Sequence, residues 1–270
     1  MDSLKKFNLV EISPQDEVVS KYIEKYQYFH IEKETWIKSL PNARLDCWFI
    51  FDGELNIWNE VKKEFSPAPA IGGYPATNTS LLFHIPGNLS CLNLKLHLRS
   101  LTIPFFRNLY PANPYTDLSQ HNIPATPINE KSIHIQGQVN IEYLDHWALN
   151  LIATSQSDLT IQSLLDVIQN KKVTTVKGLA EHSELSARNL QRVTQKAFNL
   201  SPKELLRVFR FSQTTSYFKA NPQKAFIDAL SFGYYDQSHF IRECKRISGV
   251  PPKELFANMT LSVPDLMVFD

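Results

Sequence analysis

The stretch Gly233-Tyr234-Tyr235-Asp236-Gln237-Ser238-His239-Phe240-Ile241-Arg242-Glu243 decides how the last third of this chain folds. The residues just before it, Ala225 to Phe232, have the pattern of a short helix, and Gly233-Tyr234-Tyr235 is typical of a tight turn. Asp236 is a residue type that caps helices, so a second helix is expected from Gln237 to Lys245. Two short helices joined by such a turn are the helix-turn-helix pattern.

The same pattern occurs earlier in the chain. Thr174-Thr175 can cap a helix over Val176–His182, Ser183-Glu184-Leu185 form a turn, and Ser186 caps a helix over Ala187–Lys196. The caps Ser186 and Asp236 lie fifty residues apart. Counted from each cap, the fourth residue is apolar and the sixth is arginine in both copies: Leu190 and Phe240, Arg192 and Arg242. Two matched copies make a double helix-turn-helix domain the prediction.

The segment between the two units predicts one long helix. Ser201-Pro202-Lys203-Glu204 is a capping box with proline at the first helical position, and Asn221-Pro222 ends the pattern. About 19 helical residues at about 1.5 Å each give a length of about 28 Å. Successive major-groove faces on one side of a duplex lie about 34 Å apart. Such a helix could therefore set two reading helices in adjacent major-groove segments.

These residues resemble the signature of AraC/XylS-type regulators. The run that begins at Gly233, followed by Gly249-Val250-Pro251-Pro252, is closely similar to it, and Ser186-x-Arg188-x-Leu190-x-Arg192 with Ser201-Pro202 resembles the first half of the pattern. The resemblance covers residues 160–257. It implies seven helices, sequence-specific binding of double-stranded DNA, and activation of transcription through contact with RNA polymerase.

The resemblance also implies which residues read DNA. By position in the motif these are Ala187, Arg188, Gln191 and Arg192 in the first unit and Gln237, Ser238, His239 and Arg242 in the second. Gln195 and Lys245 complete the candidate DNA-binding set, since they belong to the same two helices. Alternatives remain open: His239 could merely fill the helix surface, and Arg192 and Arg242 could form internal salt bridges.

The chain departs from the family pattern at several positions. Glu184 stands where the first turn usually has glycine, and Asn199 replaces a glycine before Ser201. Asparagine tolerates a positive φ, so we expect the second change to be mild. Core phenylalanine is common at the positions of Thr194 and Cys244, and an apolar residue at the position of Asp228.

Charge divides the chain in the same way as the motifs. Residues 160–258 hold 15 Lys and Arg against 8 Asp and Glu, a net charge of +7; residues 1–159 hold 13 against 17, and the remaining tail carries two acids. A basic third beside an acidic remainder is typical of a module that meets a polyanion, although a chance excess on a solvated surface would look the same. Within 270 residues there is room for two domains.

The first part of the chain has a mostly β pattern. Ser13-Pro14-Gln15-Asp16 predicts one early helix with an apolar face that runs to Tyr26. The run Trp48–Trp58, with Asp52-Gly53 at its centre, is typical of a hairpin with a type I′ turn. The helical period returns over Val139–Ile152, which we expect to join the two halves or to pair with a second subunit.

One predicted strand has a clean period of two. Leu92, Leu94, Leu96 and Leu98 alternate with Asn93, Lys95, His97 and Arg99. One face is therefore expected to be buried, and the polar row is expected either to face solvent or to line a ligand pocket.

The sequence thus predicts an α+β protein of two domains. Residues 1–157 form a β-rich domain, a small barrel or cupin-like fold that ends in a connecting helix; residues 158–258 form the all-α double helix-turn-helix domain; residues 259–270 are a tail. Leu40–Asp46 and Ile71-Gly72-Gly73 resemble the N-terminal domain of one subgroup of the family. That resemblance implies binding of a small-molecule effector or formation of a homodimer.

The rival interpretation is an enzyme. DNA-repair alkyl-transfer proteins couple a similar helical module to a reactive cysteine, but Cys47 and Cys91 lie in apolar strand patterns without metal-ligand spacing. We therefore expect no catalytic residue, no metal site and no cofactor. The start of the chain lacks a secretory signal and no apolar run could span a membrane, so a cytoplasmic protein is expected.

Overall fold

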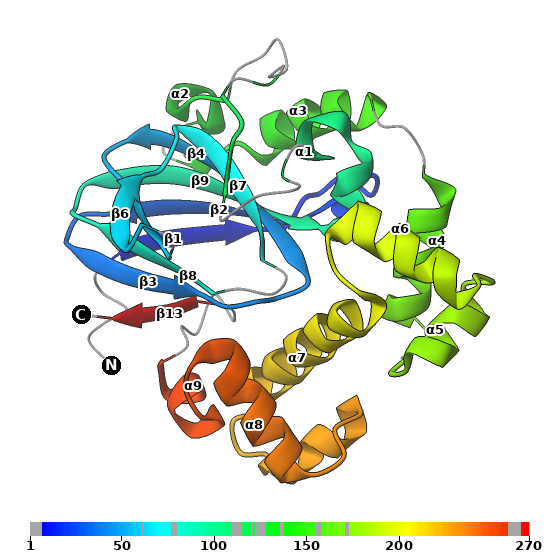
Figure 1. The fold of residues 1–270 in the computed structure, drawn as a ribbon. Helices are drawn as coiled ribbons and strands as arrows, with labels where there is room; N and C mark the ends of the chain where they lie inside the picture. The colour runs from blue at the N-terminus through cyan, green and yellow to red at the C-terminus, as the bar shows by residue number, and fades with distance from the viewer. Residues whose placement is uncertain are drawn as a thin grey trace.

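The computed structural model describes residues 7–60, 62–76, 80–107, 109, 115–119, 121, 128–135, 138–154, 158–170, 173–258 and 266–269. A β-barrel occupies the N-terminal part, and helices follow it around one end and underneath (Figure 1). The predicted α+β class, with a β-rich N-terminal domain and a helical C-terminal domain, is confirmed. No helix among the described residues is both long and apolar enough to cross a bilayer.

Two antiparallel sheets form the barrel. The six-stranded sheet has the order β1 (Phe7–Ile12), β2 (Ile23–Ile31), β9 (Leu89–His97), β4 (Arg44–Asp52), β7 (Ile71–Ala76) and β10 (Thr116–Asp117). The five-stranded sheet has the order β13 (Leu266–Phe269), β3 (Thr35–Ser39), β8 (Leu81–Ile85), β5 (Asn56–Asn59) and β6 (Glu64–Pro67). A small ladder joins β11 (His134–Ile135) to β12 (Gln138–Val139).

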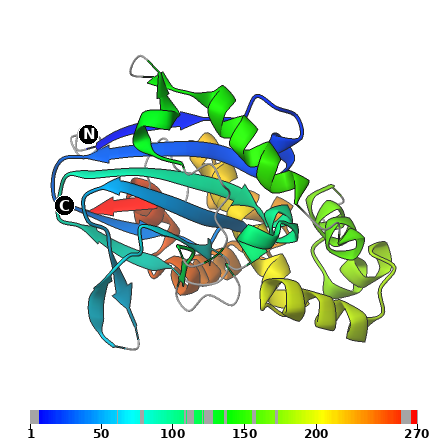
Figure 2. The same ribbon diagram turned by 90° about the horizontal axis from the view of Figure 1, so that it is seen from above.

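The larger sheet is buried on both faces. Its outer face packs against short helical elements: η2 (Val19–Lys21), η3 (Leu98–Thr102), α1 (Pro104–Arg107), α2 (Glu130–Ile133) and α3 (Ile141–Ala153). The segment expected to be helical over Val139–Ile152 forms α3; it lies across this face in Figure 2, and its Trp147 ring meets Phe49 edge-on at 5.7 Å. The inner face meets the five-stranded sheet around a second apolar core.

The alternating apolar and polar residues of β9 lie on opposite faces of the larger sheet. Leu92, Leu94 and Leu96 are fully buried under the helices, as predicted. Asn93 and Lys95 point between the sheets and line a cavity, so the polar row does not face solvent along this strand. The polar face can be buried here because Asn93 donates hydrogen bonds to Gln27 and Asp46 inside the barrel.

Two predictions for the N-terminal domain are wrong. The expected early helix is reduced to the single turn η2, because the N–H groups of Gln15 and Asp16 donate to the Asp145 carboxylate and the chain then enters β2. The expected hairpin is also absent: β4 pairs with β7 and β9, whereas β5 pairs with β6 and β8. The turn at Gly53 (φ +84°) carries the chain from one sheet to the other.

The C-terminal part consists of seven helical elements among the described residues, the number that the family resemblance implied. They are α4 (Leu159–Asn170), α5 (Val176–His182), α6 (Ala187–Phe198), α7 (Pro202–Ala220), the 3₁₀ helix η4 (Phe226–Phe232), α8 (Gln237–Ser248) and α9 (Pro252–Asn258). Residues 155–157, in the predicted linker, lie outside the described residues.

The apolar cores cross the predicted domain boundary. One core runs without interruption from the outer face of the larger sheet through Leu164 to Leu179 and Leu190 of the first helix-turn-helix unit. Leu40, in the β3–β4 connection, is 1% exposed and belongs to the core of the second unit. Strand β13, which follows α9, pairs with β3 of the barrel (Figure 1). Neither the position of Leu40 nor the pairing of β13 with β3 was predicted from the sequence.

Candidate nucleic-acid interface and barrel cavity

The first helix-turn-helix unit forms as the sequence predicts. The Thr175 hydroxyl caps α5 by accepting from the Gly178 N–H at 3.1 Å, and the Ser186 hydroxyl caps α6 by accepting from the Asn189 N–H at 3.2 Å. Leu179 and Leu190 are fully buried between the two helices. The caps and the apolar contacts fix the direction in which α6 presents its outer face.

The turn of this unit is strained at one residue. Glu184, where the family usually has glycine, has φ +55°, the left-handed conformation that glycine adopts without a steric penalty. Asn199 also has a positive φ, +49°, and ends α6 as its C-cap. Its side-chain oxygen accepts a 2.7 Å hydrogen bond from Gln195 Nε2, so the Asn replacement is accommodated locally.

All the candidate reading residues of the first unit lie at the surface. The exposed set on α6 is Ala187, Arg188, Gln191, Arg192 and Gln195. Arg192 forms no ion pair with a described residue, which removes the proposed internal salt bridge as its role within that part of the chain. The side chains of this helix are therefore available to base edges and phosphates.

The second unit keeps the same geometry with a 3₁₀ first helix. Gly233 ends η4 with φ +86°, and the Asp236 carboxylate caps α8 by accepting from the His239 N–H at 2.5 Å. Phe240 is fully buried and stacks on Phe218 of α7 with ring centroids 5.4 Å apart. Asp228, at a position where the family has an apolar residue, accepts a 3.2 Å hydrogen bond from the Tyr217 hydroxyl.

Four of the five candidate reading residues of the second unit are exposed. They are Gln237, Ser238, Arg242 and Lys245. His239 differs because its side chain is 35% exposed, its ring packs edge-on against Tyr234, and its Nδ1 accepts from the Tyr235 N–H at 3.3 Å. His239 Nε2 also lies 3.9 Å from Glu243 Oε2, so both ring nitrogens have partners within the unit.

Helix α7 joins the units as the predicted strut. It has 19 residues, and the Ser201–Glu204 capping box forms in both directions. A length of about 28 Å follows from the rise of the α-helix. The units also touch directly, because a Cβ on Gly233 would lie 2.8 Å from the Thr174 methyl group, so little free space separates them.

The sequence missed the ion pair that orients α8. Arg210 of α7 donates hydrogen bonds of 2.9 and 2.8 Å to the two carboxylate oxygens of Glu243, whose side chain is 5% exposed. The guanidinium also lies 4.6 Å from the centre of the Tyr234 ring. No local pattern indicates this pair, since its members lie on different helices 33 residues apart.

Residues 179–258 match a family model described as a helix-turn-helix domain. The C-terminal domain is an AraC-type helix-turn-helix domain. Together with the fold, this domain supports a DNA-binding transcription regulator. No curated protein matches the chain by sequence.

The whole chain resembles a solved regulator in fold. ToxT from Vibrio cholerae is similar with a TM-score of 0.52 at 13% identity, over 86% of this chain and 97% of that one. ToxT bound to (E)-4-(8-methylnaphthalen-1-yl)but-3-enoic acid is similar with the same score and identity, over 86% and 98% of the two chains. At this identity the likeness shows the fold, a barrel followed by a double helix-turn-helix domain.

The three cysteines lack the properties of an alkyl acceptor. Cys47, Cys91 and Cys244 are all buried. Burial raises the pKa of the Cys91 and Cys244 thiols to about 12, and that of Cys47 well above its usual range. A thiol that stays protonated is a poor nucleophile.

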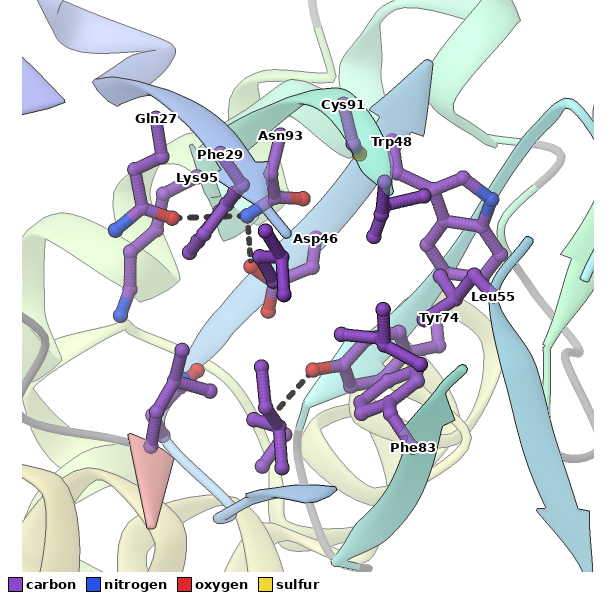
Figure 3. A pocket seen from close by; sticks show the side chains of 17 residues that line it. Gln27, Phe29, Asp46, Trp48, Leu55, Tyr74, Phe83, Cys91, Asn93 and Lys95 are labelled. Carbon is purple, nitrogen blue, oxygen red and sulfur yellow. Dashed lines mark hydrogen bonds between the residues drawn. The ribbon is translucent and has the colours of Figure 1, made fainter. Parts of the chain in front are cut away.

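The barrel interior contains a cavity of about 80 Å³ (Figure 3). Its walls are mostly apolar and aromatic, and its polar side chains gather on one wall of the larger sheet. There Asn93 Nδ2 donates to Gln27 Oε1 at 2.9 Å and to Asp46 Oδ1 at 2.8 Å, and the Lys95 side chain lies beside them. Leu266 of β13 also lines the cavity. The C-terminal strand therefore forms part of its wall.

Proposed function

We propose that this protein is a sequence-specific transcription activator that binds two adjacent major-groove segments of DNA through α6 and α8. The observation that carries the proposal is the pair of capped helices with exposed polar faces at the ends of a single 19-residue strut. DNA-binding residues of the first unit are Ala187, Arg188, Gln191, Arg192 and Gln195, and those of the second are Gln237, Ser238, His239, Arg242 and Lys245.

The net charge of +7 over residues 160–258 supports this role. Neutralisation of phosphates releases counterions, so the logarithm of affinity falls with the logarithm of salt by about 0.9 per phosphate contacted. The test is binding of the full-length protein to duplexes selected from a random pool, measured over a salt series. We expect a steep salt dependence and selected sites with two short conserved blocks about one helical turn apart. A flat salt response, or selected sites with a single block, would contradict the proposal.

The activator role has its own test. A template that carries the selected site is transcribed in vitro by RNA polymerase with and without the full-length protein, in the cytoplasmic salt range. We expect more transcript when the protein is present and no change on a template with a scrambled site. A fall in transcript on the specific template would make the protein a repressor.

We also propose that the barrel cavity is an effector site. ToxT, which shares the fold, has been solved with a naphthalene-bearing carboxylic acid. At about 80 Å³ the cavity here is smaller than the roughly 150 Å³ engineered cavity that admits benzene, so a larger effector must move one wall. The four-residue edge strand β13 is the shortest strand in the cavity wall, and in the chain it comes after α9 of the second helix-turn-helix unit.

Filling the cavity tests this part. Cys91 lines it and is buried, so Cys91→Leu adds bulk at the cavity wall. We expect the variant to bind DNA like the wild type but to respond no longer to an effector found by screening. The matched control is Cys244→Ala, which lies outside the cavity and should keep the response.

A further inference from the structure

A second hollow lies between the barrel and the first reading helix. It is a cleft of about 350 Å³ and shares no lining residue with the barrel cavity. In Figure 1, α6 lies beside the end of the barrel that carries α1. The apolar part of the cleft is formed by Leu101, Ile161, Leu185, Val193 and Ala197. An occupant with a small apolar body would therefore find a matching surface.

Three cationic side chains converge on this cleft from two domains. Arg107 lies at the end of α1 on the barrel, while Arg192 and Lys196 lie one turn apart on α6. All three are exposed, and none of them forms an ion pair with a residue of the described ranges. Like charges brought together repel, and an anion placed between them would relieve that repulsion.

The single described carboxylate in the lining is already engaged. Asp158 Oδ1 accepts a 3.2 Å hydrogen bond from the Ile161 N–H at the start of α4. Three positive groups against one such acid leave the cleft with a positive excess.

The two walls of the cleft are held in place. Arg99 of the barrel donates a 2.6 Å hydrogen bond to Asp166 of α4, and one continuous apolar core includes residues of both the barrel and α6. Arg107 Nε donates to the Leu101 carbonyl at 3.2 Å, which orients the guanidinium. A preformed arrangement of this kind lowers the entropic penalty of binding.

We propose that this cleft binds a small organic anion, a carboxylate or phosphate carried on a short apolar body, and that the anion competes with DNA. Guanidinium groups pair with both kinds of anion through two parallel hydrogen bonds. The competition rests on the proposed function, because it assigns Arg192 to the DNA-reading set. By linkage, an anion that weakens DNA binding is itself weakened by DNA to the same extent.

The binding test is done without DNA. The full-length protein is titrated in a calorimeter with 1-naphthoate, with 1-naphthyl phosphate, and with 1-naphthalenemethanol as the uncharged compound of the same shape. We expect at least one anion to bind the wild type, and Arg107→Ala and Lys196→Ala each to weaken it about fivefold. Lys203→Ala is the control, because Lys203 is exposed on α7 and outside the cleft. Absence of heat with both anions, equal binding by all four proteins, or equal binding of the alcohol would each overturn the proposal.

The competition test adds duplex DNA. The bound anion should raise the apparent Kd of the wild type for its selected site and affect Arg107→Ala less. Anion binding with an unchanged DNA affinity would overturn the competition alone. Failure of the wild type to bind any duplex would contradict the proposed function. The calorimetric titration, which contains no DNA, would still decide whether the cleft binds an anion. If no anion binds and Arg107→Ala weakens every duplex equally, the cleft is a contact for the DNA backbone and the proposal is wrong.

Discussion

Lys38 of the barrel donates a 2.8 Å hydrogen bond from Nζ to the carbonyl oxygen of Ser248, at the C-terminal end of α8. Ser80 Oγ donates to the neighbouring carbonyl of Ile247 at 3.1 Å. The last carbonyls of a helix lack partners within it and carry partial negative charge, so a lysine ammonium stabilises them. The barrel thus holds α8 by its end, and together with Leu40 it couples the two domains.

Replacing this contact should loosen α8 without changing the barrel. Lys38→Met removes the ammonium and retains much of the side-chain length, and we expect a loss of about 1 kcal/mol in stability. Hydrogen exchange should increase at the end of α8 and in α9. Lys25→Met is the control, because Lys25 contacts Ser13 and Glu11, which both belong to the N-terminal domain. Unchanged exchange in α8 would contradict a role for Lys38 in holding it.

Arg210→Met should destabilise the second unit. It leaves Glu243 buried without its main partner, and loss of one member of a buried pair costs on the order of 3 kcal/mol. Chemical denaturation measures the change. Arg246→Met removes the more exposed arginine 3.8 Å from the same carboxylate and should cost less than about 1 kcal/mol. Equal losses in the two variants would show that Arg210 has no special part in orienting α8.

Glu184→Gly should stabilise the first unit. The left-handed conformation of Glu184 costs about 1–2 kcal/mol, and glycine would remove this strain. Part of the gain is lost, because glycine also makes the unfolded chain more flexible. We expect a net gain of about 0.5 kcal/mol in thermal unfolding. Glu181→Gly, one turn earlier inside α5, should instead destabilise by about 1 kcal/mol. A loss of stability with Glu184→Gly would mean that its carboxylate makes a compensating contact.

Arg242→Ala should reduce specific DNA binding. An arginine that pairs with guanine accounts for about 1–3 kcal/mol of discrimination, so the loss should be largest on the selected site. Competition between selected and unrelated duplexes measures it, with Lys253→Ala on α9 as the control. Equal weakening on every sequence would make Arg242 a phosphate contact.

His97 should make the folded state sensitive to acid. Burial, followed by the charge of Arg44, lowers the pKa of His97 from 6.5 to about 4. The unfolded chain therefore binds more protons between these values, so stability is fully present above about pH 6.5 and is lost as pH falls toward 4. The loss is at most about 3 kcal/mol. Denaturation of His97→Gln across this range should show a smaller slope; the same slope as the wild type would exclude His97 as the cause.

The local patterns predicted the helical domain well. Ser186, Ser201 and Asp236 each cap the expected helix, and Asn199 takes the expected positive φ. Caps, turns and the spacing of apolar residues act over a few residues, so they can be recognised without knowledge of the rest of the fold. For the same reason the sequence predicted the long helix α7 and the polar outer faces of α6 and α8, where all the candidate DNA-binding residues lie.

The tertiary structure decided everything that depends on distant partners. A single turn forms in place of the expected early helix, because the Asp145 carboxylate accepts hydrogen bonds from the backbone N–H groups of Gln15 and Asp16. Arg210 pairs with Glu243, and Leu40 packs in the core of the second unit, although no pattern near these residues in the chain predicts either contact. Burial and ion pairing depend on which surfaces meet in space. The sequence alone thus determined two capped helices with exposed polar faces, joined by one long helix, and the packing of the barrel against them decided how they are held.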